Sequence, residues 1–594
     1  METEHADPPP EAGGLSGSAS ARPALTHATI QSRLCAVGAR FEMETVRVNG
    51  VATRSWKNIP RTLPDLARSA RAAHARRTFI VYEDERITYE AWFRAVAALA
   101  SDLKRRGVTR GDRVAVAMRN LPEWIVAFFA ASSCGAIVTP LNAWWTTSEL
   151  RYGLLKSGAR ALVCDGERWE RIAPVRDDLP GLAHVYVSRA SDPTAPAIAL
   201  ESVIGAPGDY DDLPDAIVPN LDMGPDDDAT LFYTSGTSGA PKGAVGSHRN
   251  ILTATLSADY ARCRMQLARG EEPAPPEPGI GLTVVPMFHV TACNAMLMST
   301  MAAGGALVFM RKWDTAKAMA LIERERISFT VGVPTIAWQL LEHPDRHKYD
   351  LSSLTAISYG GAPAAPELAR RIKSDLGAIP AFGWGMTETS AGVTVHAGEE
   401  YLDRPESCGP AVPVADLKIM SEDGRHALPI GQTGELWAAG PQIVRGYWED
   451  REATSHTFVD GWVRTGDIAR LDADGYCYIV DRAKDVIIRG GENIYSIEVE
   501  NVLYEHPAVS DAALVAVSHR TLGEVPAAVV HLAPGASATE AELQAWVRGR
   551  LAAFKTPVRI LFSGETLPRN ANGKIMKAEL KAWFAPQTDA GAAP

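Results

Sequence analysis

Residues Tyr233 to Gly243 read YTSGTSGAPKG, a run of hydroxyl side chains and glycines that ends in a lysine. The apolar residues 229–233 before it predict a strand, so the run forms a loop whose backbone N–H groups are free to bind a ligand. Glycines permit close backbone approach, while the hydroxyls and the lysine add donors and positive charge. This composition predicts a polyphosphate-binding loop. Its candidate residues are Thr234, Ser235, Gly236, Thr237, Ser238, Gly239 and Lys242.

The order of these residues excludes the P-loop of NTPases. That loop needs four residues between its first glycine and a Gly-Lys pair followed by Ser or Thr. Counting from Gly236 reaches Pro241, and Lys242 is followed by Gly243. On composition alone an ordinary surface loop remains the alternative. The full string instead resembles the phosphate-binding signature of the adenylate-forming superfamily, which includes acyl-CoA synthetases, adenylation domains and luciferases.

Length and composition describe a large globular enzyme. The chain has 594 residues, of which 46% are hydrophobic, enough for a large core and about two to four domains. Its net charge of -11 offers no broad basic surface for nucleic acid or anionic lipid. The seven cysteines are dispersed and never spaced Cys-x-x-Cys, so they predict neither disulfides nor a zinc site, and a cytoplasmic location fits.

Two long stretches without acidic or basic residues, 124–148 and 278–310, have the length of membrane spans. Neither is typical of a single helix. In the first, Pro122 marks a helix start and Gly135 a stop, followed by a strand at 136–139; in the second, Pro286 and the glycines at 304–305 interrupt the run. We expect buried helix–strand pairs and no transmembrane segment.

Helical patterns alternate with short apolar strands from about residue 62 onward, which predicts an α/β layered architecture. Five mostly charged residues, 481–485, then separate two apolar strands. Beyond them a helix from Ser496, strands at 512–517 and 527–531, and a helix opened by the capping box Thr539-x-x-Glu542 predict a compact α+β unit.

The predicted domains are therefore an N-terminal domain (43–481), a hinge (482–485) and a C-terminal domain (486–583), with a flexible tail at 584–594. Residues 1–42 are rich in Ala, Pro, Gly and Ser, which predicts a disordered extension. Met43 is a candidate for the initiation site. The superfamily resemblance, which extends over roughly 60–580, implies layered α/β sheets with a small β-barrel-like part in the first domain and a smaller, mobile second domain.

Several motifs carry this resemblance in the large domain. The segment Gly383-Trp384-Gly385-Met386-Thr387-Glu388 resembles the family's aromatic-Gly-x-Thr-Glu motif. The resemblance implies that Glu388 binds Mg²⁺ and that Thr387 donates to the α-phosphate of ATP; carboxylate oxygens are natural Mg²⁺ ligands. It also implies that Trp384, Gly360, Gly361 and Ala362 line the nucleotide pocket, that Asp467 accepts hydrogen bonds from the ribose, and that Arg482 contacts the nucleotide.

The C-terminal segment 568–574, PRNANGK, resembles the motif whose lysine bridges the substrate carboxylate and the phosphate. Lys574 is thereby implied as the catalytic cation. Because a thiol must later reach the same carbonyl, the small domain should swing away, with Lys484 as the hinge residue and Gly491 lining the pantetheine tunnel. Ser496 stands where many relatives have proline.

His289, in PMFHV, resembles the position beside the substrate carboxylate, although a lone histidine in an apolar run is equally well a core residue. We expect an AMP-forming acyl-CoA ligase that uses ATP, Mg²⁺ and CoA to activate an apolar acid, with a weak preference for fatty acids. Two alternatives are an enzyme that loads a carrier-protein phosphopantetheine thiol and a non-catalytic acid-binding homologue. The sequence leaves the oligomeric state open.

Overall fold

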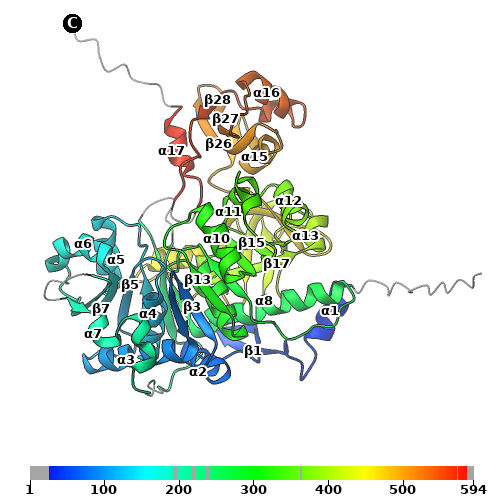
Figure 1. Cartoon of the computed structure of the whole chain (residues 1–594). Helices are drawn as coiled ribbons and strands as arrows, with labels where there is room; N and C mark the ends of the chain where they lie inside the picture. Colours follow the sequence, from blue (N-terminus) through cyan, green and yellow to red (C-terminus); the bar gives the residue numbers. More distant parts are fainter. Residues whose placement is uncertain are drawn as a thin grey trace, which may run out of the picture.

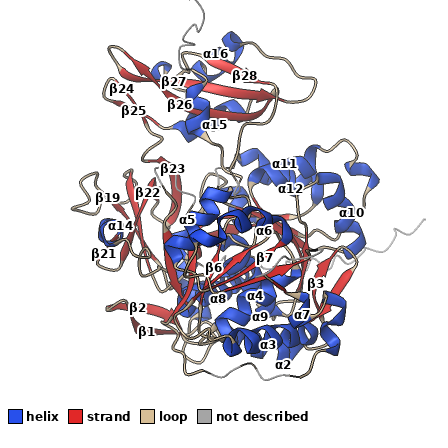
Figure 2. Cartoon of the chain, turned by 90° about the vertical axis from the view of Figure 1, so that its left-hand side faces the viewer, coloured by secondary structure: helices blue, strands red, loops and turns tan. Residues whose placement is uncertain are grey.

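The computed structural model describes residues 26–190, 197–215, 218, 221–234, 240–361, 364–570 and 573–584. Within these ranges the chain forms a large domain and a small domain, and the small domain stands above the large one in Figures 1 and 2. The large domain contains sheets of seven, eight and six strands and a two-stranded ribbon, whereas the small domain contains one five-stranded sheet and its flanking helices.

Two mostly parallel sheets form the body of the large domain. The seven-stranded sheet has the order β11-β10-β6-β5-β7-β8-β9, and only its β10–β11 pair is antiparallel. Its strands are β5 (Arg113–Ala117), β6 (Ile137–Pro140), β7 (Ala161–Asp165), β8 (His184–Ser188), β9 (Ile198–Ala199), β10 (Asp228–Tyr233) and β11 (Gly243–Ser247).

The eight-stranded sheet has the order β17-β16-β15-β14-β12-β13-β3-β4, with antiparallel pairs only at its two edges. Its strands are β3 (Thr78–Tyr82), β4 (Glu85–Thr88), β12 (Ile280–Thr283), β13 (Ala306–Phe309), β14 (Phe329–Gly332), β15 (Ala356–Tyr359), β16 (Ile379–Met386) and β17 (Ala391–Ala397).

Helices cover both faces of each sheet, as parallel strands require. One hydrophobic cluster joins the two sheets through helices that lie between them, α2 (Leu63–His74), α3 (Tyr89–Arg105), α4 (Pro122–Ser133) and α9 (Met298–Ala303). The outer face of the seven-stranded sheet packs on α5 (Thr147–Ser157) and α6 (Gly166–Ile172). The outer face of the eight-stranded sheet packs on α10 (Thr315–Glu325), α11 (Pro334–Glu342) and α12 (Pro366–Leu376).

A six-stranded antiparallel sheet stands where the barrel-like part was expected. Its main path is β18-β23-β22-β20-β19, and β21 pairs with β22. The strands are β18 (Gly409–Pro410), β19 (Asp416–Met420), β20 (Gly434–Ala439), β21 (Phe458–Val459), β22 (Trp462–Leu471) and β23 (Tyr476–Arg482). This sheet shares a hydrophobic cluster with α8 (His248–Ala268), and β23 leads directly to the small domain (Figure 2).

The small domain agrees with the α+β unit expected from sequence. Helices α15 (Ser496–Tyr504) and α16 (Glu540–Arg548) pack on its sheet, and α16 begins with the predicted capping box, in which Thr539 and Glu542 bind each other's backbone. The short α17 (Lys577–Ala582) packs on β26 (Val509–His519), a strand at the edge of this sheet. The strands are β24 (Ile487–Arg489), β25 (Glu492–Ile494), β26 (Val509–His519), β27 (Gly523–Leu532) and β28 (Ile560–Ser563).

The N-terminal segment corrects one expectation. Residues 26–42 lie in the stretch predicted to be disordered, yet 27–34 form helix α1 (His27–Leu34), capped by the Thr26 side chain. Ile30, Leu34 and Phe41 are buried against the cluster shared by α8 and the six-stranded sheet, followed by the ribbon β1 (Met43–Val48) and β2 (Val51–Trp56). Composition did not indicate that this segment is ordered, because burial of only three apolar side chains is enough to hold a mostly polar segment against the domain.

The uncharged stretches behave as predicted. Residues 122–133 form α4 and 137–140 form β6, and the second stretch is divided among β12, a π-helical turn η3 (Thr291–Leu297), α9 and β13. In the part of the chain that the structure describes, no helix is long and apolar enough to cross a membrane.

Candidate active site

A deep cleft opens where the small domain meets the carboxyl ends of β12, β14 and β15. In open α/β sheets this edge is the usual position of a ligand site. Both domains contribute to its lining, and most of the residues singled out in the sequence lie there. Those are Thr234, Lys242, His289, Gly360, Gly361, Trp384, Thr387, Glu388, Asp467, Arg482, Lys484 and Lys574.

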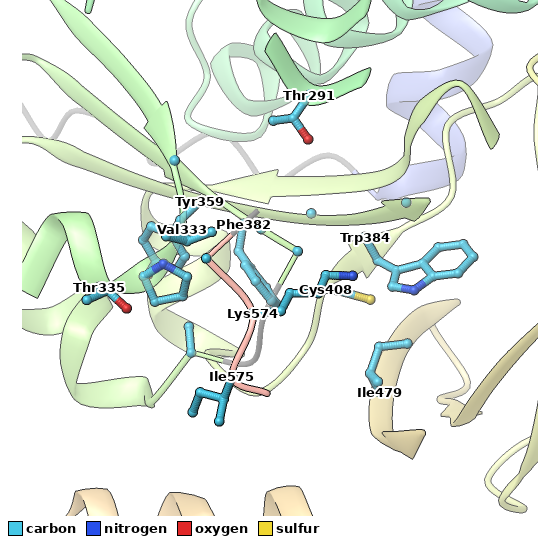
Figure 3. Close-up of a pocket in the computed structure, with 18 of the residues that line it drawn as sticks. Thr291, Val333, Thr335, Tyr359, Phe382, Trp384, Cys408, Ile479, Lys574 and Ile575 are labelled. Carbon is cyan, nitrogen blue, oxygen red and sulfur yellow. The ribbon is translucent and has the colours of Figure 1, made fainter. Parts of the chain in front are cut away.

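Lys574 enters the cleft from the small domain on a tight loop (Figure 3). Gly573 has φ +75°, and a Cβ on it would lie 2.8 Å from the Val333 side chain of the large domain, so this position requires glycine. The Arg569 guanidinium donates to the Gly573 carbonyl at 2.9 Å and pairs with Asp511 at 2.8 Å. The loop is therefore held at its base and pressed against the large domain.

Burial in this cleft is the main cause that lowers the pKa of Lys574 to about 8, and the charge of Arg482 acts in the same direction. The carboxylates of Asp467 and Glu388 oppose this shift. Lys574 is therefore a cation near neutral pH whose charge is weakly compensated. Such a group favours an incoming anion.

Asp467 is fixed by two donors. The Trp384 indole N–H donates to one carboxylate oxygen at 2.7 Å, and the Arg482 guanidinium binds the other at 2.6 Å. Asp467 and Arg482 face each other as cross-strand partners on β22 and β23. Trp384 arrives from β16 of the other sheet. The arrangement brings three sequence-predicted nucleotide contacts into one hydrogen-bonded unit.

Glu388 lies in a short turn, η5 (Thr387–Thr389), and is 7% exposed. The Tyr447 hydroxyl donates to its Oε1 at 2.6 Å. Directly after the turn, Ser390 and Ala391 have positive φ angles of 55° and 144°. Backbone in these unfavourable regions persists where the surrounding structure imposes it, often at functional sites. Tyr447 was not singled out in the sequence, because nothing local links it to Glu388.

The carboxylate of Glu388 suits the Mg²⁺ that accompanies ATP. Tyr447 orients one oxygen, and Glu388 shares the cleft with Thr387 and Lys242. Mg²⁺ is commonly held by one or two carboxylates together with substrate phosphates and water. Among the described residues, no group of three His, Cys, Asp or Glu side chains forms a complete metal cage. Glu388 therefore fits a metal ion that arrives with the nucleotide.

The structure describes only part of the predicted phosphate-binding loop. Thr234 and Lys242 close the neck of the loop: the Thr234 N–H donates to the Lys242 carbonyl at 2.8 Å, and the Lys242 N–H donates to the Thr234 hydroxyl at 3.3 Å. The Lys242 ammonium lies 5.2 Å from the centre of the Tyr447 ring. Ser235, Gly236, Thr237, Ser238 and Gly239 lie outside the described residues, as does Ala362.

Close backbone contacts shape the pocket around Gly360 and Gly361. A Cβ on Gly360 would lie 3.1 Å from the Gly383 carbonyl oxygen, and Gly361 has φ +75°. On β16, a Cβ on Gly385 would lie 2.0 Å from the Ala391 carbonyl oxygen. A side chain at Gly360 or Gly385 would push β16 away from its neighbours, whereas Gly361 has open space around it and favours glycine through its positive φ.

His289 faces the cleft, and its Nδ1 accepts the Thr291 N–H at 3.3 Å. Burial lowers its pKa to about 4, and the nearby charge of Lys574 contributes. The imidazole is thus neutral near pH 7. With Nδ1 occupied as an acceptor, the hydrogen of the neutral ring is on Nε2, which leaves one donor for a ligand.

The cleft continues past His289 between the eight-stranded sheet and the helical segment η3–α9. Its helical wall is a row of small side chains spaced four residues apart, Thr291, Ala295, Ser299 and Ala303. The opposite wall is formed by Phe329, Val331, Ser358 and Ala381, three of which are register partners on β14, β15 and β16. The row on the helical side spans at most roughly 18 Å, which is the rise of a regular α-helix over the same residues, since the π-helical η3 rises less per residue. We call this extension the acyl channel.

Lys484 and Gly491 lie in different places. Lys484 is in the connection between β23 and β24 and lines the cleft, and burial lowers its pKa. Gly491 is in the turn between β24 and β25 with φ +94° and is not among the cleft-lining residues. Its predicted contact with a thiol arm therefore requires a second orientation of the small domain and stays a prediction.

Comparison with known proteins agrees with this geometry. Residues 66–448 match the AMP-binding enzyme family, and residues 498–574 match the AMP-binding enzyme C-terminal domain. A feruloyl-CoA synthase from Amycolatopsis sp. is 35% identical over 84% of this chain and 94% of its own length. A 4-coumarate–CoA ligase from Humulus lupulus is 31% identical over 84% of this chain and 89% of its own.

Among solved structures, ATP-bound MatB from Rhodopseudomonas palustris aligns with a TM-score of 0.75 and 28% identity, covering 88% of this chain and 99% of MatB. An anthranilate CoA ligase in complex with anthranoyl-AMP aligns with a TM-score of 0.79 over 88% of this chain and 97% of its own, and its 24% identity supports the fold. The chain therefore belongs to the AMP-binding enzyme family of adenylate-forming enzymes, in its acyl-CoA synthetase branch, and is an AMP-forming acid–thiol ligase that uses ATP, Mg²⁺ and CoA.

Proposed function

We propose that this ligase activates an apolar aromatic acid of the phenylpropenoic kind and transfers it to CoA through an acyl-adenylate. The observation that carries the proposal is the meeting of Lys574, Asp467, Glu388 and His289 around one cleft that continues into the acyl channel. The nucleotide side of the cleft is charged and hydrogen-bonded, whereas the named side chains of the channel are uncharged and, apart from Phe329, small. The junction between them is where a carboxylate would meet the α-phosphate.

In the first half-reaction the carboxylate oxygen attacks the α-phosphorus of ATP, and pyrophosphate leaves. Two anions must approach each other, so a cation between them stabilises the transition state more than the separated reactants. We assign this cation to Lys574. Asp467, held by Trp384 and Arg482, anchors the ribose, while the Thr387 hydroxyl donates to the α-phosphate and Lys242 binds the phosphates that leave.

His289 is proposed to orient the acid. Because its imidazole is neutral and Nδ1 accepts the Thr291 N–H, the Nε2–H can donate to the substrate carboxylate without adding charge. Glu388 is proposed to bind the Mg²⁺ that offsets the phosphate charge, oriented by Tyr447.

In the second half-reaction the CoA thiolate attacks the acyl-adenylate carbonyl, forming the thioester and releasing AMP. Lys574 occupies part of the space that the thiol needs, so its loop must first withdraw. The hinge proposed at Lys484 permits that movement, and the hairpin turn at Gly490 and Gly491 is proposed to approach the thiol arm afterwards. Water is kept from the adenylate while the loop is seated.

The proposal of an aromatic acid is supported by the relatives named feruloyl-CoA synthase and 4-coumarate–CoA ligase. A planar ring also suits a channel with one wall made of a sheet face carrying small residues such as Ser358 and Ala381. A fatty acid is the second candidate, because the channel extends along the full row from Thr291 to Ala303. That length exceeds what a single-ring acid requires.

A panel of acids tests the assignment. Pyrophosphate release would be measured with benzoic, cinnamic, 4-hydroxycinnamic and ferulic acids against straight-chain acids from six to sixteen carbons. We expect the phenylpropenoic acids to give the highest kcat/KM. A maximum among the straight-chain acids would favour the second candidate, and no turnover with any acid would contradict both. AMP formation with CoA and no carrier protein would exclude a carrier-loading enzyme.

A further inference from the structure

A buried polar cluster crosses the hinge between the two domains. It consists of Asp481 at the end of β23, Ser496 and Glu500 on α15, and Lys577 at the start of α17; we call it the hinge cluster. Asp481 is 1% exposed, Ser496 is 0% exposed and Glu500 is 7% exposed. Asp481 belongs to the large domain, because it pairs with Ile468 of β22, whereas the other three residues belong to the small domain.

Ser496 is the centre of this cluster. Its backbone N–H and its hydroxyl both donate to the Asp481 carboxylate, the hydroxyl at 2.9 Å. The Lys577 ammonium donates to the Ser496 oxygen at 2.6 Å and pairs with Glu500 at 2.7 Å. Glu500 also accepts the Leu514 N–H at 2.7 Å. Every link except the bonds to Asp481 therefore lies inside the small domain.

Rotation at the hinge must break the bonds between Ser496 and Asp481. Hinge residues 482–485 separate Asp481 from the small domain, so the carboxylate stays with β22 while Ser496 moves. Hydrogen bonds to a charged group in a buried setting are among the stronger ones in proteins. They hold the small domain in the orientation seen in Figures 1 and 2.

The same cluster reaches the catalytic loop. Lys577 follows Lys574 by three residues, at the start of α17, and Lys574 is the residue that enters the cleft in Figure 3. We infer that Ser496 is a positioning residue for Lys574: by joining Asp481 to Lys577 across the hinge, it keeps the Lys574 loop seated in the cleft for adenylation. The inference rests on the adenylation role proposed for Lys574.

A proline substitution isolates this role without harm to the helix. Ser496 is the first residue of α15, a position where proline is favoured because its fixed φ suits the helix and because no hydrogen bond within the helix uses the N–H of this residue. Ser496→Pro therefore removes both bonds to Asp481 and the acceptor of Lys577, and it leaves the helix start sound. Ser496→Ala removes only the hydroxyl and keeps the N–H.

The two half-reactions of each variant would be measured separately, adenylation by single-turnover pyrophosphate release with the best acid, and thioester formation from supplied acyl-AMP and CoA. We expect Ser496→Pro to lower the adenylation rate by about tenfold or more and Ser496→Ala by a smaller factor. Thioester formation should be unchanged or faster, because the small domain leaves the cleft more easily. A purely structural defect would lower both steps.

Two comparisons make the outcome decisive. Ser518→Ala alters an exposed serine on β26 of the same domain and should change neither step. Lys574→Ala tests the proposed function itself: if it abolishes adenylation while Ser496→Pro adenylates at the normal rate, the positioning role is wrong and the lysine assignment stands. Equal loss in both half-reactions for Ser496→Pro, with an unchanged unfolding transition, would also overturn the inference.

Discussion

At the scale of single residues, the charge of Lys574 is the most sensitive element of the site. Its ammonium enters a cleft that disfavours charge, and the carboxylates of Asp467 and Glu388 offset this only in part. A bound carboxylate and phosphate would supply the missing negative charge. In the mechanism proposed above, the charge of Lys574 is therefore fully balanced only when both substrates are bound.

Replacing this lysine should separate the two chemical steps. Lys574→Ala is expected to lose on the order of 10²-fold or more in adenylation, as for removal of a preorganised transition-state donor. Thioester formation from supplied acyl-AMP should continue, since the lysine must leave before that step. Pyrophosphate release and thioester formation measured side by side test this. Equal loss in both steps with the fold intact would refute the assignment.

The pH dependence has a defined sign. The role proposed for Lys574 requires its protonated form, and its pKa is lowered to about 8 in the ligand-free protein. The kcat/KM for ATP in adenylation, which reports the free enzyme, should therefore fall as pH rises through about 8. His289, with a pKa lowered to about 4, stays neutral over this range.

Lys574→Arg is the matched control for that profile. Arginine keeps its charge at every pH used here, so the fall near pH 8 should vanish from the residual activity of this variant. If the variant shows the same fall as the original chain, another group is responsible for it.

The sequence motifs predicted best which residues would line the site. Lys574, Asp467, Glu388 and Arg482 carry charges whose spacing in recognisable motifs fixed their expected roles, and the structure brings them to one cleft. The bond from Tyr447 to Glu388 could not be foreseen, because it joins residues 59 positions apart through a contact made only in the folded chain. The same holds for Trp384 and Asp467.

At the scale of elements, the β16–β17 hairpin fixes the nucleotide side of the cleft. It carries Trp384 and, in the turn between its strands, Thr387 and Glu388. The backbones of its two strands approach so closely at Gly385 that only glycine fits there. The position of the Glu388 carboxylate, which we propose to bind Mg²⁺, therefore depends on this backbone contact as well as on the hydrogen bond from Tyr447.

Gly385→Ala should consequently destabilise the large domain. The added Cβ would lie 2.0 Å from the Ala391 carbonyl oxygen, and the forced shift should cost about 3 kcal/mol of unfolding free energy. Gly392→Ala on the facing strand is the control, because its Cβ would meet nothing nearer than 3.7 Å. Denaturant unfolding of both variants tests this, and equal stabilities would contradict it.

Elements with local signals were predictable, whereas those set by distant pairing were not. Pro122 predicted the start of α4, and the capping box at Thr539 predicted the start of α16. The π-helical turn η3 has no such signal, and its row of small residues acquires meaning only opposite β14–β16. The prediction that residues 26–42 are disordered was wrong for the same reason, since α1 gains its stability from contacts with α8 and not from its own composition.

At the scale of the whole molecule, the segment containing α1 packs against the large domain and stabilises it. Phe41 is 3% exposed and makes edge contacts with Trp56 and Tyr260, which in turn pack on the cluster under the six-stranded sheet. This contact joins the first described residues to the sheet that carries Asp467.

Phe41→Ala should lower the unfolding free energy by about 3 to 5 kcal/mol, as for other large-to-small changes at buried aromatic positions. Val37→Ala, four residues earlier and 94% exposed, should change it by no more than about 0.5 kcal/mol. Thermal or denaturant unfolding would compare the two. An unchanged midpoint for Phe41→Ala would show that the segment contributes nothing to the fold.

The helical wall of the acyl channel and the charged residues of the cleft come from different parts of the chain. Thr291, Ala295, Ser299 and Ala303 belong to η3 and α9, whereas Asp467, Arg482 and Lys574 come from β22, β23 and the small domain. Bulkier or smaller residues along that helical row would resize the channel and leave Asp467, Arg482 and Lys574 untouched. Homologous enzymes can thus come to accept different acids through a few substitutions in the helical row, while the residues around the nucleotide are kept.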